Sequence, residues 1–262
     1  MTGVLYGTVA LVTGASSGIG EATARELAAR GAAVAVVARR ADRLKVLAED
    51  IRTAGGDALA LDADVTDEAQ ARDAVERAVA NWGRLDILVN NAGVARLGPI
   101  VDGPVEEWEQ MVRLNVLGQF YCVHAALPHL LRAADDGPRR VADLVNVSSV
   151  SGRTARKGAG VYSATKHAVN AFSESLRQEV AGRHVRVCVL EPGAVATELF
   201  RHRTPEVQRH RTPEVQRQHA PEAGRFERLR PEDVADTVGY VVTRPRHVAM
   251  SEVLMRPSEQ ER

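Results

Sequence analysis

The chain of 262 residues carries 34 basic and 34 acidic side chains, so its formal net charge is zero at pH 7. A balanced chain has no global field that would draw it to nucleic acid or to an anionic membrane. Hydrophobic residues make up 45% and charged residues 26% of the chain, which excludes a disordered or collagen-like protein and leaves enough apolar sequence for one large core.

Targeting and metal-binding signals are missing from the sequence. The N-terminal stretch has no charged segment followed by an apolar one, and no apolar run approaches the ~18 residues that a membrane span needs. Cys122 and Cys188 each lie among apolar residues and outside any metal-binding spacing. We therefore expect a reduced, cytoplasmic protein without a metal site, a signal peptide or a membrane partner.

Short runs rich in Val, Leu and Ile predict the strands of a parallel sheet. Strands that are buried on both faces read as continuous apolar runs rather than as alternating ones. Such runs occur, in chain order, at 9–12, 33–37, 58–61, 85–89, 144–147 and 185–190.

Amphipathic segments alternate with these runs. The predicted helices cover 21–30, 42–54, 67–82, 105–133, 160–181 and 231–243. This alternation predicts an α/β protein with a doubly wound parallel β-sheet, the Rossmann fold, flanked by helices. No linker is evident, so we expect a single domain that spans residues 1–262.

Glycines cluster where the first predicted strand meets the first helix, in the segment TGASSGIG at 13–20. Gly14, Gly18 and Gly20 would let the backbone approach a pyrophosphate, and the N-terminus of the following helix favours its negative charge. A tight strand–helix connection would use the same glycines, so the motif alone leaves both interpretations open.

Tyr162 and Lys166 form a second candidate pair. They stand four residues apart in the predicted helix 160–181, so their side chains share one face. A free phenol has a pKa of ~10, and a nearby ammonium favours its ionised form. We expect Lys166 to lower the pKa of Tyr162 toward the range useful for acid–base chemistry. A core tyrosine beside a surface lysine is the structural alternative.

The end of the second predicted strand indicates which nucleotide would bind. An NAD site places an acidic residue there, whereas this chain has Ala38 followed by Arg39 and Arg40. Two guanidinium groups suit the 2′-phosphate of NADP(H), and no carboxylate stands at the same position. An exposed loop in an arginine-rich chain is the alternative.

Further motifs follow in a fixed order along the chain. They are Asn90-Asn91-Ala92-Gly93 after the fourth strand, Asn115, Ser148-Ser149 at the end of the fifth strand, Tyr162-x-x-x-Lys166, and Pro192-Gly193 with Thr197 after the sixth. Together with the glycine spacing at 14–20, this set resembles the short-chain dehydrogenase/reductase family over essentially the whole chain.

The resemblance implies a role for each catalytic residue. Tyr162 would be the general acid or base, and Lys166 would lower its pKa and contact the nicotinamide ribose. Ser149 would donate a hydrogen bond to the substrate oxygen on which charge develops. Asn115 would hold a water that links Lys166 to solvent.

It also implies an NADP(H) site at the edge of the sheet. Hydride would come from this cofactor, which the protein only positions. The implied cofactor-binding residues are Gly14, Ser16, Ser17, Gly18, Ile19, Gly20, Arg39, Arg40, Asp64, Val65, Asn91, Ala92, Gly93, Tyr162, Lys166, Pro192, Gly193, Val195 and Thr197.

Residues 38–40, 126–131 and the tail 251–260 resemble the single-domain, NADP-dependent branch that includes clavulanate dehydrogenase and the serine/3-hydroxy-acid dehydrogenases. This branch implies a small-molecule carbonyl or alcohol substrate, such as an aldehyde, a ketone or a 3-oxo/3-hydroxy acid, with secondary metabolism as one setting. It also implies a homotetramer or a dimer. The alternatives are a ketoacyl-type reductase of fatty-acid or polyketide metabolism and a catalytically silent NADP-binding regulator.

One stretch departs from the family pattern. The octapeptide HRTPEVQR occurs twice in tandem, at 202–209 and 210–217, within a segment at about 199–228 that is poor in large apolar residues. In the family this position leads into the substrate loop, so we expect an insertion that acts as a lid. An inert duplicated loop is the alternative. Its arginines lack interleaved aromatic residues, so we expect no nucleic-acid partner.

Overall fold

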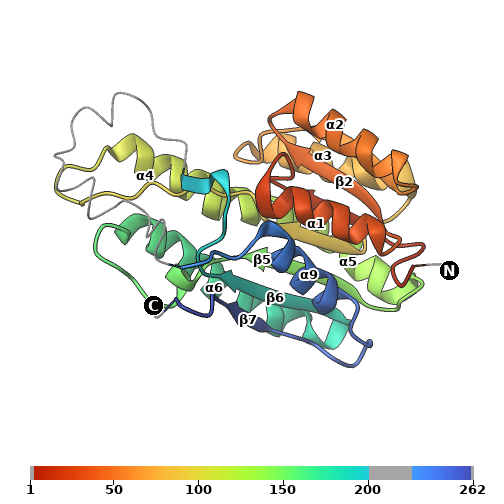
Figure 1. The fold of residues 1–262 in the computed structure, drawn as a ribbon. Coiled ribbons are helices and arrows are strands. Elements are labelled where there is room, and N and C mark those ends of the chain that lie inside the picture. Colours follow the sequence, from red (N-terminus) through yellow and green to blue (C-terminus); the bar gives the residue numbers. More distant parts are fainter. Residues whose placement is uncertain (1–2, 201–225, 261–262) are drawn as a thin grey trace.

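Parallel strands form the centre of the molecule. The computed structural model describes residues 3–200 and 226–260, and within them seven parallel strands make one sheet in the order β3-β2-β1-β4-β5-β6-β7 (Figure 1). The strands are β1 (Val9–Thr13), β2 (Ala33–Ala38), β3 (Asp57–Asp62), β4 (Ile87–Asn90), β5 (Ala142–Val147), β6 (Val185–Pro192) and β7 (Glu252–Met255). The predicted doubly wound parallel sheet is confirmed.

Strand β7 was not among the predicted strands. It has only four residues, pairs with β6 alone, and alternates between exposed and half-buried side chains, so it lacks the continuous apolar run of the buried strands.

The helices match the predicted segments with one exception. They are α1 (Gly18–Ala29), α2 (Ala41–Thr53), α3 (Glu68–Trp82), α4 (Val105–Val112), α5 (Gly118–Asp136), α6 (Gly160–Val180) and α9 (Pro231–Val242). Local sequence sets their starts: the side chain of Asp67 accepts a hydrogen bond from the backbone N–H of Gln70 at 3.0 Å, and Pro231 opens α9.

The exception is the single helix predicted over 105–133. The structure divides it into α4, a π-helical turn η1 (Arg113–Leu117) and α5. Turns of this wider kind often occur at functional sites, and η1 carries the buried Asn115. Apolar periodicity does not distinguish a π-turn from the α-helix around it, so this break could not be predicted from the residues.

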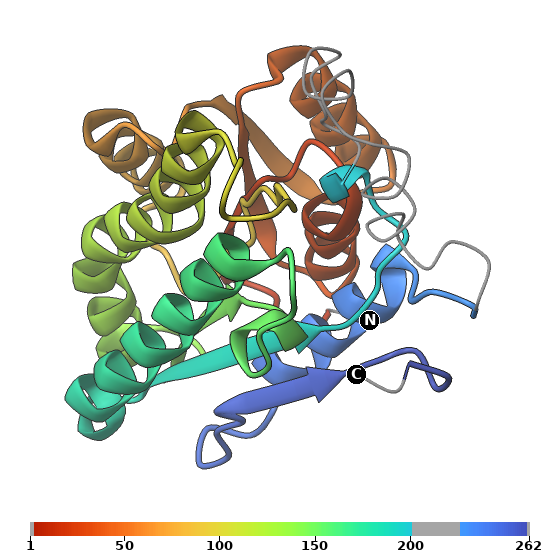
Figure 2. The same cartoon turned by 90° about the vertical axis from the view of Figure 1, so that its left-hand side faces the viewer.

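Helices cover both faces of the sheet (Figure 2). On one face α1, α2 and α9 pack through buried residues such as Leu27, Leu44 and Val234. On the other face α3, α5 and α6 pack through residues such as Val75 and Leu176. Two cores on opposite sides of the sheet explain why its central strands are apolar throughout.

The strand order reverses between β1 and β4, which are hydrogen-bonded neighbours. In a doubly wound sheet, ligands bind at this point, in the crevice outside the carboxyl ends of the strands. Most predicted site segments follow directly after one of the strands β1 to β6, whereas Asn115 lies in η1 and Tyr162 and Lys166 lie in α6. The fold therefore collects the whole predicted site at one edge.

The opposite edge holds a buried network of charged groups. Near the start of β5, Asp143 accepts hydrogen bonds from Arg139 and, at 2.7 Å, from Nε of Arg186 in β6. The guanidinium of Arg186 also donates to the carbonyl oxygens of Val242, Arg244, Pro245 and Val248. Burial raises the pKa of Asp143, and the two arginines oppose that shift. Removing one partner of such a pair would leave the other charge buried and unpaired, at a cost of about 3–5 kcal/mol.

No helix in residues 3–200 and 226–260 combines the length and the apolar character that crossing a bilayer requires. In the same ranges, no group of three or more His, Cys, Asp or Glu side chains is arranged to hold a metal ion. Most of the expected lid at 199–228, including both octapeptides, lies in 201–225 and thus outside the described residues.

Candidate active site

A cavity of about 410 Å³ opens at the carboxyl edge of the sheet. All of the predicted catalytic and cofactor-binding residues line it except Gly20 and Asn115. Those two are buried directly behind lining residues: a side chain on Gly20 would strike the carbonyl oxygen of Gly14, and Asn115 bonds to Val94. The fold thus brings nearly all of these residues to one cavity, and its size suits a small ligand.

The glycine-rich turn forms one wall of the cavity. Gly14 has φ +66°, and a Cβ there would lie 2.8 Å from Cα of Ala92. Gly18 has φ +59°, and a Cβ there would lie 3.0 Å from the side chain of Thr197. Both positions therefore need glycine for their conformation and for the close approach of neighbouring chain. Helix α1 begins at Gly18, so its free N–H groups are available to an anion in the cavity.

The turn after β4 is fixed to β1. The side-chain amide of Asn91 donates to the carbonyl oxygen of Thr13 at 3.0 Å. The backbone N–H groups of Asn91 and Ala92 both donate to Oγ1 of Thr13, at 3.0 and 3.1 Å. These bonds present Ala92 and Gly93 to the cavity as backbone rather than as side chains.

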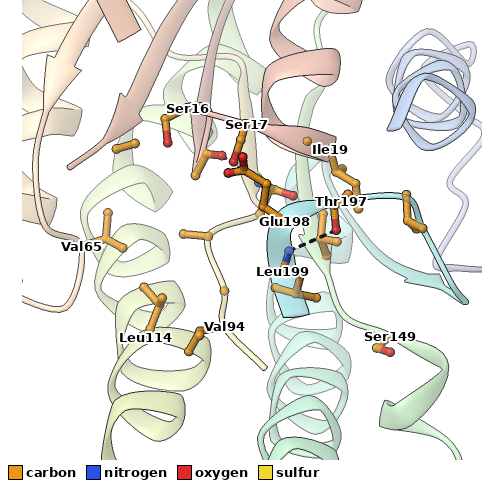
Figure 3. A pocket seen from close by; sticks show the side chains of 18 of the residues that line it. Ser16, Ser17, Ile19, Val65, Val94, Leu114, Ser149, Thr197, Glu198 and Leu199 are labelled. Atoms are coloured by element: carbon orange, nitrogen blue, oxygen red, sulfur yellow. Dashed lines mark hydrogen bonds between the residues drawn. The ribbon is translucent and has the colours of Figure 1, made fainter. Parts of the chain in front are cut away.

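Beside the glycine-rich turn, Arg40 is the centre of a polar cluster. Its Nε donates to Oγ of Ser16 at 2.9 Å, and its Nη2 donates to Oγ of Ser17 at 2.6 Å. Its Nη1 donates to the carboxylate of Glu198 at 3.1 Å, which Arg43 also reaches at 3.2 Å. Figure 3 shows Glu198 lying close to Ser17. These arginines lower the pKa of Glu198 and keep it ionised.

Arg39 lies apart from this cluster. Its side chain is 72% exposed, and its nearest acidic partner is Asp64, at 3.8 Å. The sequence treated Arg39 and Arg40 as an equivalent pair, and the structure corrects this. Successive residues at the end of a strand point in different directions, so only one of two neighbours reaches Ser16 and Ser17.

Tyr162 and Lys166 share one face of α6, as predicted. Both are buried, and Nζ of Lys166 lies 5.9 Å from the centroid of the Tyr162 ring. The same ammonium group donates to the carbonyl oxygen of Val147, at the end of β5, at 2.9 Å. This bond holds Lys166 at the floor of the cavity.

The pKa values of the pair differ from the expectation. Burial raises the pKa of Tyr162 to about 12, although its hydrogen bond with Ser149 acts in the opposite direction. Burial also lowers the pKa of Lys166 to about 8. Burial is thus the largest effect on the Tyr162 pKa in the protein alone, and it acts against ionisation of the phenol. The expected lowering of the Tyr162 pKa by Lys166 stays a prediction. Residue spacing does not report how strongly a site is shielded from water.

Ser149 follows β5 and brings a second hydroxyl to Tyr162. Its Oγ accepts a hydrogen bond from the backbone N–H of Ser151 at 3.1 Å, and the Ser149 side chain is hydrogen-bonded to Tyr162. Two hydroxyl groups that lie together in a cavity can both bond to one substrate oxygen, which is the arrangement that stabilises charge developing there.

Asn115 connects two parts of the site. Its Oδ1 accepts a hydrogen bond from the N–H of Val94 at 2.8 Å, and its Nδ2 donates to the carbonyl oxygen of Val94 at 2.9 Å and to Oγ1 of Thr165 at 3.1 Å. It thereby ties the turn after β4 to α6. The implied role in holding a water stays a prediction.

An apolar cluster surrounds Tyr162 at the other end of the cavity. Ala95 and Met111 pack with Tyr162, and Val94, Leu97, Trp108, Val161 and Leu199 pack against them. Figure 3 shows Val94 and Leu114 on one side of the cavity and Leu199 on the other. This end offers apolar surface to a small molecule.

Two charged lining residues were not predicted, namely Arg96 and Glu198. Their only sequence signal is proximity to motifs: Arg96 stands three residues after Gly93, and Glu198 directly follows Thr197. Sequence alone cannot distinguish a charge that faces a cavity from one that faces solvent.

The sequence profile described as short chain dehydrogenase matches residues 8–208, well over half of the chain. The chain belongs to the short-chain dehydrogenase family. It is accordingly an oxidoreductase, and the order of its motifs reflects this membership.

Relatives differ in substrate and nucleotide. An uncharacterized oxidoreductase of Staphylococcus epidermidis is 34% identical over 249 residues, which are 95% of this chain and 96% of that one. The closed form of a serine dehydrogenase in complex with NADP+ is 32% identical, with a TM-score of 0.84 and 97% of each chain covered. A 3-ketoacyl-(acyl-carrier-protein) reductase from Brucella melitensis in complex with NADH is 30% identical, with a TM-score of 0.81, and the match covers 97% of this chain and 98% of that one.

Proposed function

We propose that the protein transfers hydride between NADP(H) and a small-molecule carbonyl or alcohol, namely an aldehyde, a ketone or a 3-oxo/3-hydroxy acid. The observation that carries this proposal is the meeting of the Ser149 and Tyr162 hydroxyls with Lys166 in one cavity that also contains the glycine turn and Arg40. The catalytic groups and the nucleotide-binding groups thus face the same space.

Tyr162 is suited to donate a proton. Because its pKa is raised to about 12, it keeps its proton at neutral pH and is present in the acid form that carbonyl reduction requires. During reduction, Tyr162 would protonate the substrate oxygen while Ser149 donates a second hydrogen bond to it. When bound, the nicotinamide supplies or accepts the hydride. The apolar cluster around Tyr162 would exclude water.

The nucleotide end fits a phosphorylated cofactor. Gly14 and Gly18 admit close approach to the backbone, and the start of α1 favours negative charge. Arg40, with the hydroxyls of Ser16 and Ser17, offers charge-assisted bonds to a 2′-phosphate. The carboxylate of Glu198 bonds to Arg40 in this structure, so a 2′-phosphate would have to displace it from the guanidinium. Arg39, exposed at the rim, would contribute less.

A ketoacyl-type reductase remains the alternative, favoured by the similarity to the Brucella melitensis enzyme. A catalytically silent regulator fits less well, because Ser149, Tyr162 and Lys166 are all buried in contact with the cavity. We further propose a cytoplasmic homotetramer or dimer that assembles through the long helices α5 and α6. These helices lie side by side, since Phe120 and Phe172 stack with ring centroids 4.1 Å apart.

A screen for NADPH oxidation with aldehydes, ketones and 3-oxo acids tests the proposal, with Tyr162→Phe as the control. We expect at least one class of carbonyl to be reduced by the wild type and not by the variant. Absence of NADPH oxidation above the Tyr162→Phe background with every class would overturn the proposed function.

A further inference from the structure

Arg96 is a lining residue that the proposed chemistry leaves without a role. It lies in the turn after β4, and its Nη1 is shut off from solvent without a hydrogen-bond partner among the described residues. Burial is the main effect on its guanidinium and lowers its pKa, while Glu107 acts weakly in the opposite direction. The residue nevertheless keeps its charge, because a free arginine loses its proton only above pH ~12.

An unpaired buried donor is costly. Leaving one without a partner destabilises the folded protein, and it does so more strongly when the group is charged. Native proteins therefore keep few such groups, and each calls for an explanation. A ligand that pairs with the group when bound is one such explanation.

The main chain of Arg96 is held beside the catalytic tyrosine. Its two neighbours, Ala95 and Leu97, belong to the apolar cluster that packs on Tyr162. Its own backbone N–H donates to Sδ of Met111, a member of the same cluster, at 3.3 Å. Arg96 therefore belongs to the substrate end of the cavity rather than to the nucleotide end.

Other cationic groups in the described lining have partners. Arg40 bonds to Ser16, Ser17 and Glu198, and Arg39 lies near Asp64. Lys166 donates to the carbonyl oxygen of Val147. Arg96 differs from all three, because it has an unpartnered buried nitrogen and stands among apolar side chains.

We propose that Arg96 binds a carboxylate of the substrate, so that the enzyme acts on small oxo or hydroxy acids rather than on neutral aldehydes and ketones. This inference rests on the proposed function and narrows its substrate class. The planar guanidinium can bond to both oxygens of a carboxylate. Arg96 lines the cavity, and a guanidinium that bonds to a substrate carboxylate there would discriminate against analogues that lack the carboxylate.

Matched substrates test the inference. A 3-oxo acid and its methyl ester present the same carbonyl and differ in charge. We expect the wild type to show a kcat/KM about 10- to 100-fold higher for the acid, as the loss of a charge-assisted bond implies. Arg96→Met should abolish this preference, mainly through KM, and Arg96→Lys should restore part of it. Arg113→Met, which removes an exposed arginine and the same charge, is the control and should keep the preference.

Two further measurements separate binding from structure. A carboxylate without a carbonyl, such as propionate, should compete with the substrate in the wild type and not in Arg96→Met. The melting temperature of Arg96→Met should equal or exceed that of the wild type, because the substitution removes an unpaired buried donor.

The possible outcomes are distinct. If NADPH is oxidised with the ester as fast as with the acid, or if Arg96→Met keeps the preference for the acid, the inference is wrong and the proposed function stands. If Arg96→Met loses activity toward the acid and the ester equally and has a lower melting temperature than the wild type, Arg96 is structural and the inference is again wrong. If no carbonyl is reduced at all, the proposed function itself fails.

Discussion

Arg40 and Glu198 form an ion pair in which Nη1 and Oε2 lie 3.1 Å apart. Arg40 precedes α2, and Glu198 begins the short helical turn η4 (Glu198–Phe200), 158 residues later in the chain. Glu198 also directly follows Thr197, whose hydroxyl accepts a hydrogen bond from the N–H of Leu199 at 3.4 Å. The pair therefore joins the nucleotide end of the cavity to the segment that leads to its substrate end.

Replacing Glu198 by Gln should raise the affinity for NADPH. The carboxylate competes with a 2′-phosphate for Arg40, and half-exposed ion pairs of this kind contribute up to about 1 kcal/mol. We expect Kd for NADPH to fall about two- to fivefold and Kd for NADH to stay the same, measured by fluorescence titration. Glu21→Gln, which breaks an exposed pair with Arg25, is the control. An equal gain for both nucleotides would contradict the competition.

Arg40→Ala should weaken NADPH binding about 10- to 100-fold, because a charge-assisted bond to phosphate contributes about 1.5–3 kcal/mol. Arg39→Ala provides a matched control, since the exposed Arg39 does not reach Ser16 or Ser17. Fluorescence titration with NADPH and with NADH measures Kd for both variants. Equal losses in the two variants, or equal wild-type affinities for NADPH and NADH, would show that Arg40 does not select the nucleotide.

Tyr162→Phe should remove nearly all turnover and leave NADPH binding intact. The substitution deletes the hydroxyl that bonds to Ser149 and keeps the ring that packs on Ala95 and Met111. Loss of a general acid typically lowers kcat by ~10²–10⁴-fold. A variant that kept more than about a tenth of the wild-type kcat would refute the role of the phenol.

Lys166 should make the stability of the nucleotide-free protein increase with pH. Its pKa is about 8 in the folded protein and 10.5 when unperturbed. Between these values the unfolded chain binds a proton that the folded protein does not, so the free energy of unfolding rises with pH there. Below about pH 8 both states carry the proton and the contribution is constant. The raised pKa of Tyr162 acts in the opposite direction only as the pH rises from 10 toward 12.

Urea unfolding of the wild type and Lys166→Met at pH 8, 9 and 10 measures this effect. We expect the wild type to gain up to about 3 kcal/mol relative to the variant over the window, from ~1.4 kcal/mol for each pKa unit. Lys157→Met removes an exposed lysine and should track the wild type. If the free energy of unfolding changed with pH in the same way for the wild type and for Lys166→Met, the pKa of Lys166 would not be lowered in the folded protein.

Sequence predicted the parts of this molecule that depend on local pattern. Apolar runs located β1 to β6, and the motif order located the cavity. What it missed depends on contacts between distant segments. The partner of Arg40 comes from Glu198, and the shielding that shifts the pKa of Tyr162 comes from several elements. The π-helical turn at Asn115 leaves the apolar pattern of the surrounding helix unchanged.

The charged network of Asp143 and Arg186 occupies the edge of the sheet opposite to Arg96 and Leu199. These two lining residues are therefore physically remote from the buried ionic contacts near the start of β5. A lineage that duplicates this gene can alter Arg96 or Leu199 in one copy without a large cost to folding. Substitutions that change the substrate preference then cost little stability, and one fold can acquire many different substrate specificities.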